Sequence, residues 1–327
     1  MSAILINGQF LSVNDAQVSA FDAGFQHGVG LFETLLGGCS ESGPWALHLE
    51  DHLLRLVTSA SQLGLSDDLR TAGLSDAVKS ALERAELPRA RVRLTVTGGD
   101  LNMLSRARQG GSSAAALPTV MVHVQPATAY PEELYDAGVS VVLASLRVNP
   151  LDPTAGHKTL NYWARLRELQ QAAVARAGEA LVFQVTNHLS GGCVSNAFLV
   201  GEERGRPVLF TPIARGEETD VADVSRAPEL PGAGEKGVAM PSPVLPGVVR
   251  EWVMDRATSM GLIVQRKMLT IDDVLAAREV FLTNSSWGVM PVVKVESHAV
   301  GDGRVGPLTR EMVVAWREDV EVAARAE

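Results

Sequence analysis

Residues 157–200 decide how this chain is interpreted: HKTLNYWARLRELQQAAVARAGEALVFQVTNHLSGGCVSNAFLV. The stretch opens with Lys158, four residues before Tyr162. It continues as a helix, a strand, a Gly/Ser/Asn-rich turn and a second strand. A lysine in such a loop can form a Schiff base with a carbonyl cofactor. A surface charge at the start of an ordinary helix is the commoner role of a single lysine, so the rest of the chain must decide between the two.

The composition is that of a globular protein with room for two cores. The chain has 327 residues, of which 46% are hydrophobic and 20% charged, and its formal net charge is −9. This charge argues against nucleic-acid binding, which normally requires a basic surface. It places no limit on a small-molecule site, because one local arginine can bind an anion in an acidic protein.

Several other classes lack sequence support. Two cysteines, Cys39 and Cys193, are too few for a disulfide framework or a Cys-rich metal site. The chain has no HExxH, P-loop or GxGxxG motif. Its first residues, MSAILINGQF, do not resemble a signal peptide, and no apolar run approaches the roughly 18 residues of a membrane span. We therefore expect a cytoplasmic protein without a membrane partner.

The first 125 residues predict a small α+β domain. An Asn7-Gly8 turn indicates a hairpin, and the Gly-punctuated segment from Phe21 predicts a loop followed by a strand from Leu31. A helix is expected from Leu74 to Ala85, capped by Ser75-Asp76. A further helix and two strands are expected at 48–65, 91–97 and 119–124, with a flexible loop at 106–118.

A Pro-containing linker at 126–135 precedes a larger C-terminal α/β domain at 136–327. There we expect a helix from Leu160 to Ala177, ended by Gly178. Residues from about 214 to 243 are rich in Gly, Pro and acidic side chains without periodicity, which indicates an insertion. The other expected elements are strands at 139–148, 180–185, 197–200, 206–211, 279–283 and 289–295, a loop followed by a helix within 245–262, and helices at 271–277 and the C-terminus.

Only five lysines compete for a chemical role. Lys79 lies on an amphipathic helix, Lys236 in the insertion, and Lys267 and Lys294 flank strands near charged residues. Each of these four is explained as a solvated charge. Lys158 alone lies in a strand-to-helix loop near a tyrosine, and it is the candidate nucleophile.

Seven motifs in order resemble the class IV, fold-type IV pyridoxal-phosphate enzymes. That family includes branched-chain aminotransferases, D-amino-acid aminotransferases and 4-amino-4-deoxychorismate lyases. The resemblance implies a two-domain α+β fold of the D-amino-acid aminotransferase type. It covers nearly the whole chain, through NGQFLSVNDAQVSAFDAGFQHGVGLFET, HLLRL, HKTLNYW, EALVFQVTNHLSGGCVSNAFLV, LPGVVR, EVFLTNSSWGVMPV and GPLT.

The resemblance assigns a site for pyridoxal 5'-phosphate. Lys158 matches the Schiff-base lysine and Arg55 the phosphate arginine. A turn at Gly247 leading into a helix offers backbone N–H groups to an anion. The other cofactor-binding residues that the resemblance implies are Tyr162, Val248, Val249, Ser285 and Ser286.

Two departures from the family pattern concern the reaction. The glutamate that normally faces the pyridine nitrogen aligns with Gly191, and no nearby carboxylate replaces it, although His188 is a candidate if it turns inward. An arginine common before the glycine in RLTVTGGD is replaced by Gly98. Arg93 stays on the strand as a candidate for the substrate carboxylate. The resemblance also assigns to the substrate His27, which stands where many relatives have an aromatic ring, and Glu33, which shapes the pocket entrance.

The sequence thus predicts a class IV aminotransferase acting on a small amino or keto acid through Lys158. The resemblance also implies a homodimer. Two alternatives stay open. One is a 4-amino-4-deoxychorismate lyase that releases pyruvate. The other is a non-transaminating member of the fold that binds a ligand or a partner.

Overall fold

The computed structural model describes residues 2–100, 117–218 and 240–325. Most of the loop expected at 106–118 and the middle of the 214–243 insertion lie outside these ranges. The chain divides into two compact units. The first contains residues up to Ala129, residues 158–161 and the segment from Asp319, and the second contains Tyr130–His157 and Tyr162–Glu318.

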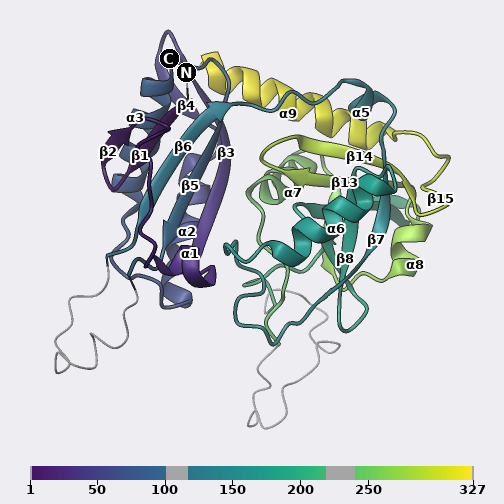
Figure 1. The fold of residues 1–327 in the computed structure, drawn as a ribbon. Helices are drawn as coiled ribbons and strands as arrows, with labels where there is room; N and C mark the ends of the chain where they lie inside the picture. The colour runs from purple at the N-terminus through teal and green to yellow at the C-terminus, as the bar shows by residue number, and fades with distance from the viewer. Residues whose placement is uncertain (1, 101–116, 219–239, 326–327) are drawn as a thin grey trace. The chain divides into compact units, whose positions relative to one another are not determined.

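The first unit is built on a six-stranded sheet in the order β2-β1-β6-β5-β3-β4. Every neighbouring pair is antiparallel. Helices α2 and α3 pack on one face of the sheet (Figure 1). The elements are β1 (Ala3–Ile6), β2 (Gln9–Leu11), α1 (Ala23–His27), β3 (Gly30–Ser40), β4 (Gly43–Ala46), α2 (Leu49–Gln62), α3 (Thr71–Ala85), β5 (Ala90–Thr97) and β6 (Val120–Pro126).

The core of the first unit follows from the apolar periodicity of its helices. Leu49, Leu53, Leu56 and Ala60 lie on one face of α2 and are buried against the sheet. From α3, Val78 and Leu82 join the same cluster. The expected start of α3 is wrong, because the helix begins at Thr71, three residues before Leu74, and Ser75-Asp76 lies inside it. A short helix, α1, was also missed in the segment expected to be a loop.

The second unit contains a nine-stranded mixed sheet. Its path is β12-β11-β10-β13-β14-β7-β8-β9, and β15 pairs with β14. Strand β9 also contacts β10 and β11, so the sheet curls. The elements are α5 (Glu133–Asp136), β7 (Val139–Val148), α6 (Trp163–Val174), β8 (Glu179–Gln184), β9 (Leu189–Gly192), β10 (Asn196–Glu203), β11 (Arg206–Pro212), α7 (Val248–Ser259), β12 (Ile263–Lys267), α8 (Ile271–Ala276), β13 (Glu279–Asn284), β14 (Gly288–Val295), β15 (His298–Ala299) and α9 (Pro307–Arg325).

Helix α6 is shorter at both ends than the sequence predicts. Residues 158–161 do not join it, because Phe32 N donates to Lys158 O at 3.0 Å and Leu160 N donates to Gly30 O at 2.9 Å. At the other end, Ala175 caps the helix, and Arg176 rather than Gly178 adopts the left-handed conformation, with φ 58°. The segment that carries Lys158 is therefore held as an extended edge on β3.

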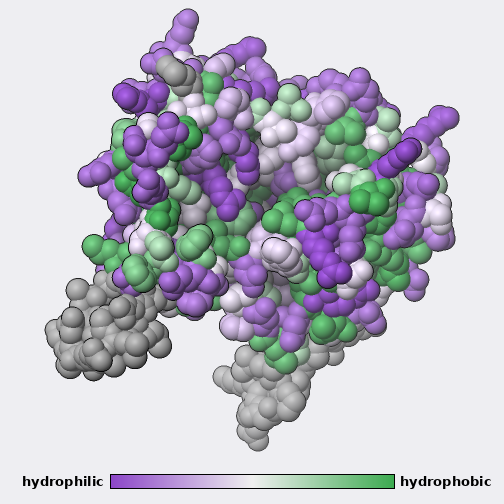
Figure 2. Space-filling model, in the orientation of Figure 1, coloured by the Kyte–Doolittle hydropathy of each residue, from purple (hydrophilic) through white to green (hydrophobic). Residues whose placement is uncertain are grey.

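Hydrophilic and hydrophobic residues are interspersed over the face of the molecule drawn in Figure 2. Among the described residues, no helix has both the length and the apolar character needed to cross a membrane.

Candidate functional site

Lys158 lies beside an aromatic ring of β3. Its Nζ atom is 4.5 Å from the centroid of the Phe32 ring, and its backbone carbonyl accepts the Phe32 N–H. The residue is half-buried, and an isolated bridge pairs Leu31 with Thr159. The backbone of the lysine is thus fixed by strand pairing, while its amine lies over a ring face that favours a cation.

Arg93 contacts the same ring. The guanidinium carbon lies 3.9 Å from the Phe32 centroid, and Arg93 is paired with Thr34 in the β3–β5 ladder. The structure therefore brings Arg93 and Lys158 to one aromatic side chain. His27, in contrast, is exposed at the last position of α1.

Glu33 forms a buried pair with Arg55. Arg55 Nε donates to Glu33 Oε1 at 2.9 Å, and Nη2 donates to Oε2 at 2.5 Å. His52 Nδ1 lies 2.7 Å from the same Oε2. Only 1% of the Glu33 side chain is exposed, and its assignment to a pocket entrance stays a prediction. The arginine assigned to the phosphate is held by a carboxylate of the neighbouring strand.

The pKa values in this cluster follow from burial and charge. Burial alone would raise the pKa of Glu33, but the Arg55 charge and the His52 hydrogen bond lower it to about 2. Burial lowers the pKa of His52, against the opposing effect of Glu33. Glu33 is thus a carboxylate and His52 a neutral imidazole at pH 7.

Position 191, in β9 just before the turn at residues 193–195, carries no side chain. Gly191 has φ 141°, and a Cβ built on it would lie 2.7 Å from Ser195 O. That carbonyl already accepts the Gly192 N–H at 2.9 Å. The backbone of Ser195 therefore occupies the space into which a larger side chain would project. A glutamate at position 191 would need a different local backbone arrangement. His188 bonds to Thr186 at the β8–β9 turn.

A buried glutamate lies beneath this turn. Glu179 Oε1 accepts the Cys193 N–H at 2.6 Å and the Ala180 N–H at 3.3 Å. Its Oε2 and the Ser195 hydroxyl are buried without a hydrogen-bond partner. Burial raises the pKa of Glu179 to about 7, although backbone donors and Arg165 oppose the shift. Arg165 Nη1 donates to the carbonyls of Gly192 and Cys193 at 3.2 and 3.1 Å.

The first turn of α7 presents a helix N-terminus. Gly247 is the N-cap, without a side-chain capping bond, and Val248 and Val249 are buried. A Cβ on Gly247 would lie 1.9 Å from Asn196 Oδ1, so only glycine permits this approach. Asn196 Nδ2 donates to Leu245 O at 2.8 Å. The N–H groups of such a turn have no partner within the helix and attract anions.

Ser285 and Ser286 lie in the turn between β13 and β14. Asn284 Oδ1 accepts the N–H groups of Ser286 at 2.9 Å and Trp287 at 3.1 Å. Asn284 Nδ2 donates to Val194 O at 3.3 Å, which links this turn to the turn after β9. The second unit therefore holds the turn of Ser285 and Ser286 against the turn that follows β9. Tyr162 precedes α6, and its ring centroid lies 5.9 Å from Arg165 Cζ.

Sequence reasoning missed the residues that support the candidate site residues in each of the two units. Glu179, Asn196 and Asn284 fix the two turns of the second unit, and Phe32 and His52 surround the charges of the first. The side-chain partners of Asn196 and Asn284 lie 49 and 90 residues away, beyond the range of any local motif.

Comparison with known proteins identifies the fold and the family. The family model for amino-transferase class IV matches residues 30–295, which is most of the chain. This chain belongs to the class IV aminotransferases. The family depends on pyridoxal phosphate and includes aminotransferases and lyases.

Three relatives of this class IV protein span nearly its full length. The D-alanine aminotransferase of Bacillus licheniformis is 25% identical over 97% of this chain and 96% of its own. The structure of Escherichia coli branched-chain amino acid aminotransferase has a TM-score of 0.79 at 24% identity and covers 97% and 93% of the two chains. The structure of 4-amino-4-deoxychorismate lyase from Pseudomonas aeruginosa has a TM-score of 0.74 at 25% identity, with 97% and 99% covered.

The side chains present fit pyridoxal phosphate in part. Lys158 supplies an amine, Arg55 a cation and the first turn of α7 backbone donors. The buried, unpartnered hydroxyls of Ser195 and Thr283 are further polar groups near the turns of the second unit. Position 191 supplies no carboxylate, and the Ser195 carbonyl fills the adjacent space. Each unit by itself thus carries groups that suit part of this cofactor: an amine and a cation in the first, and backbone donors but no carboxylate at position 191 in the second.

Proposed function

We propose that this protein is a pyridoxal-phosphate-dependent aminotransferase of class IV that acts on a small amino or keto acid, with Lys158 as the amine that binds the cofactor. The observation that carries the proposal is the placement of Lys158. Its backbone is paired with β3 and its amine lies 4.5 Å from the Phe32 ring centroid. Lys79, Lys236, Lys267 and Lys294 do not lie in the motif that the resemblance assigns to the cofactor.

When bound, pyridoxal phosphate withdraws electrons from the substrate α-carbon and carries the amino group between two acids. Lys158 holds the aldehyde end and moves the proton between the substrate carbon and the cofactor. Arg55, Val248, Val249, Ser285 and Ser286 would hold the phosphate, and Tyr162 would contact the ring oxygen. Arg93 and His27 are the candidates to bind the substrate, and Arg93 is favoured because it shares Phe32 with Lys158.

The second candidate is a 4-amino-4-deoxychorismate lyase. The likeness to the lyase of Pseudomonas aeruginosa covers 99% of that chain. Without a carboxylate at 191 the ring nitrogen is held less firmly in its protonated form, so reactions that need less carbanion stabilisation are affected less. In either case we propose a cytoplasmic homodimer.

Absorbance spectroscopy tests the proposal. The purified protein is titrated with pyridoxal phosphate, and the expected result is a new absorbance band that Lys158→Ala abolishes. Lys267→Ala, which removes a lysine outside the assigned site, is the matched control and should keep the band. No band in the wild type contradicts the enzyme reading.

A panel of L- and D-amino acids then separates the activities. Conversion of the bound cofactor to its amine form identifies an aminotransferase and gives its stereochemical preference. Pyruvate release from 4-amino-4-deoxychorismate without that conversion identifies the lyase. A band that no amino acid changes, without pyruvate release, identifies a member of the fold that binds a ligand only.

A further inference from the structure

The two ends of the insertion, residues 213–218 and 240–245, are bonded to each other, and we call them the insertion base. Ser242 N donates to Glu218 Oε1 at 2.5 Å, and Ser242 Oγ donates to Ile213 O at 2.6 Å. Arg215 N donates to Val244 O at 2.9 Å. The two ends of the insertion are thus bonded to each other through side chains and backbone.

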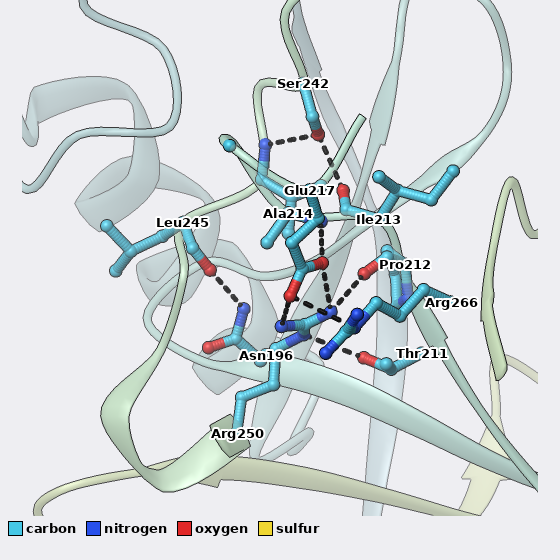
Figure 3. A network of polar contacts seen from close by, with 12 residues as sticks. Asn196, Thr211, Pro212, Ile213, Ala214, Glu217, Ser242, Leu245, Arg250 and Arg266 are labelled. Atoms are coloured by element: carbon cyan, nitrogen blue, oxygen red, sulfur yellow. Dashed lines mark hydrogen bonds and ion pairs between the residues drawn. The ribbon is translucent and has the colours of Figure 1, made fainter. Parts of the chain in front are cut away.

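Glu217 connects the insertion base to the first turn of α7. Arg250 Nη1 donates to Glu217 Oε1 at 2.7 Å and Nη2 to Oε2 at 2.8 Å, a bidentate pair. The Arg250 side chain is 1% exposed. Figure 3 shows the Arg250 guanidinium between Glu217, Thr211 and Pro212, with Arg266 beside the same carboxylate.

The partners of Arg250 fix the helix from its third residue. Nε donates to Thr211 Oγ1 at 3.2 Å, and Nη2 also donates to Pro212 O at 2.9 Å. Arg250 directly follows Val248 and Val249 in the first turn of α7, the turn proposed to bind the phosphate. Burial would raise the pKa of Glu217, but its bonds with Arg250 lower it, so the carboxylate compensates the buried cation at neutral pH.

Arg215 of the insertion base contacts the segment before Lys158. Arg215 Nε donates to Ala155 O at 2.8 Å, and a Cβ on Gly156 would lie 2.8 Å from that Nε atom. Burial and the Arg215 charge lower the pKa of His157 to about 4, so the imidazole beside Lys158 in the sequence is neutral. The insertion base therefore contacts the chain just before Lys158 as well as helix α7, whose first turn is proposed to bind the phosphate.

We propose that Glu217 is a positioning residue for the cofactor phosphate, acting through Arg250 on the first turn of α7. The bidentate pair with Glu217 occupies the Arg250 guanidinium. It thereby fixes the first turn of α7, whose backbone N–H groups at Val248 and Val249 bind the anion. This inference rests on the proposed function, since the phosphate at α7 is that of pyridoxal phosphate.

The test compares two ligands that differ only in the phosphate. Kd values for pyridoxal phosphate and for pyridoxal are measured on the full-length wild type, Glu217→Gln, Glu217→Asp and Glu218→Gln. Glu218→Gln is the matched control, because Glu218 belongs to the insertion base but bonds to Ser242 and Gly216 instead of Arg250. Circular dichroism establishes that each variant is folded.

The expected result is a phosphate-specific loss. In Glu217→Gln the Kd for pyridoxal phosphate should rise by about tenfold, while pyridoxal itself binds as in the wild type. The ratio of the Kd for pyridoxal to the Kd for pyridoxal phosphate should therefore fall by about tenfold, which corresponds to ~1.4 kcal/mol. Glu217→Asp should retain part of the ratio and Glu218→Gln nearly all of it. A merely structural role would weaken both ligands together.

An unchanged or increased ratio in folded Glu217→Gln would overturn the inference, and so would an equal loss in Glu218→Gln. If Glu217→Gln does not fold, Glu217→Asp decides, since an unchanged ratio in that variant is also contradictory. A wild type that binds neither ligand contradicts the proposed function instead, so the two failures are distinguishable.

Discussion

Glu33 in the first unit and Glu179 in the second are both 1% exposed, yet their pKa values move in opposite directions. Glu33 receives two hydrogen bonds from Arg55 and contacts His52, and its pKa falls to about 2. Glu179 receives bonds from backbone N–H groups on one oxygen only, and its pKa rises to about 7. The partner of a buried carboxyl thus decides its charge, and burial alone does not.

The difference separates two roles. Glu33 is a permanent anion that compensates the arginine proposed for the phosphate. Glu179 is protonated over part of the physiological pH range, and it supports the turn that follows Gly191 and Gly192. The comparison predicts that these two glutamates respond differently to substitution and to pH.

Replacement of each glutamate by glutamine should have the largest and most unequal effect. Glu33→Gln leaves Arg55 as an uncompensated cation and should lower the free energy of unfolding by about 3–5 kcal/mol at pH 7. Glu179→Gln keeps an acceptor for the Cys193 N–H and should cost less than about 1 kcal/mol. Urea unfolding of both variants measures the difference, and equal losses would show that burial outweighs the partner.

Acid should weaken the contribution of Glu33. Its pKa is about 2 in the folded protein and 4.5 ordinarily, so its stabilisation is complete above pH 4.5 and is lost as the pH falls toward 2. The loss amounts to about 3 kcal/mol by linkage. Urea titrations of wild type and Glu33→Gln from pH 5 to pH 2 should converge. Parallel curves would exclude the low pKa.

The pH dependence of Glu179 should have the opposite sign. Its pKa is raised from 4.5 to about 7, so the unfolded chain loses the proton first as pH rises. The free energy of unfolding should therefore fall between pH 4.5 and 7, by up to about 3 kcal/mol, relative to Glu179→Gln. A wild type that gains stability over this interval relative to the variant would contradict the assignment.

Arg165→Gln should give a small change in stability that depends on pH. The substitution removes the donor to the Gly192 and Cys193 carbonyls and a charge that lowers the pKa of Glu179. We expect a loss of about 1 kcal/mol at pH 5, increasing toward pH 8 as Glu179 ionises. Thermal unfolding at the two pH values measures it, and a loss independent of pH would separate Arg165 from Glu179.

The sequence predicted the elements whose signals are local. The hairpin at Asn7-Gly8 and helix α2 are confirmed, because a turn dipeptide and an apolar repeat specify them within a few residues. The start of α6 was wrong, because pairing of residues 158–161 with β3 overrides helical propensity. No local pattern could show this, since Gly30 and Leu160 are far apart in the sequence.

The candidate site divides in the same way. Lys158 and Arg55 were chosen from motifs, but the carboxylate of Glu33 as the partner of Arg55 required the geometry of α2 against β3. Glu217 and Arg250 belong to different motifs, and only folding joins them. The resemblance located Gly191, while the structure added that the Ser195 carbonyl fills the adjacent space.

The central claim is that Lys158 is the residue that binds pyridoxal phosphate. The direct measurement is borohydride reduction of the protein incubated with the cofactor, followed by peptide mass spectrometry to locate the modified lysine among the five in the chain. The account predicts one phosphopyridoxyl group per chain, on Lys158. Modification at another lysine, or none at Lys158, would contradict it.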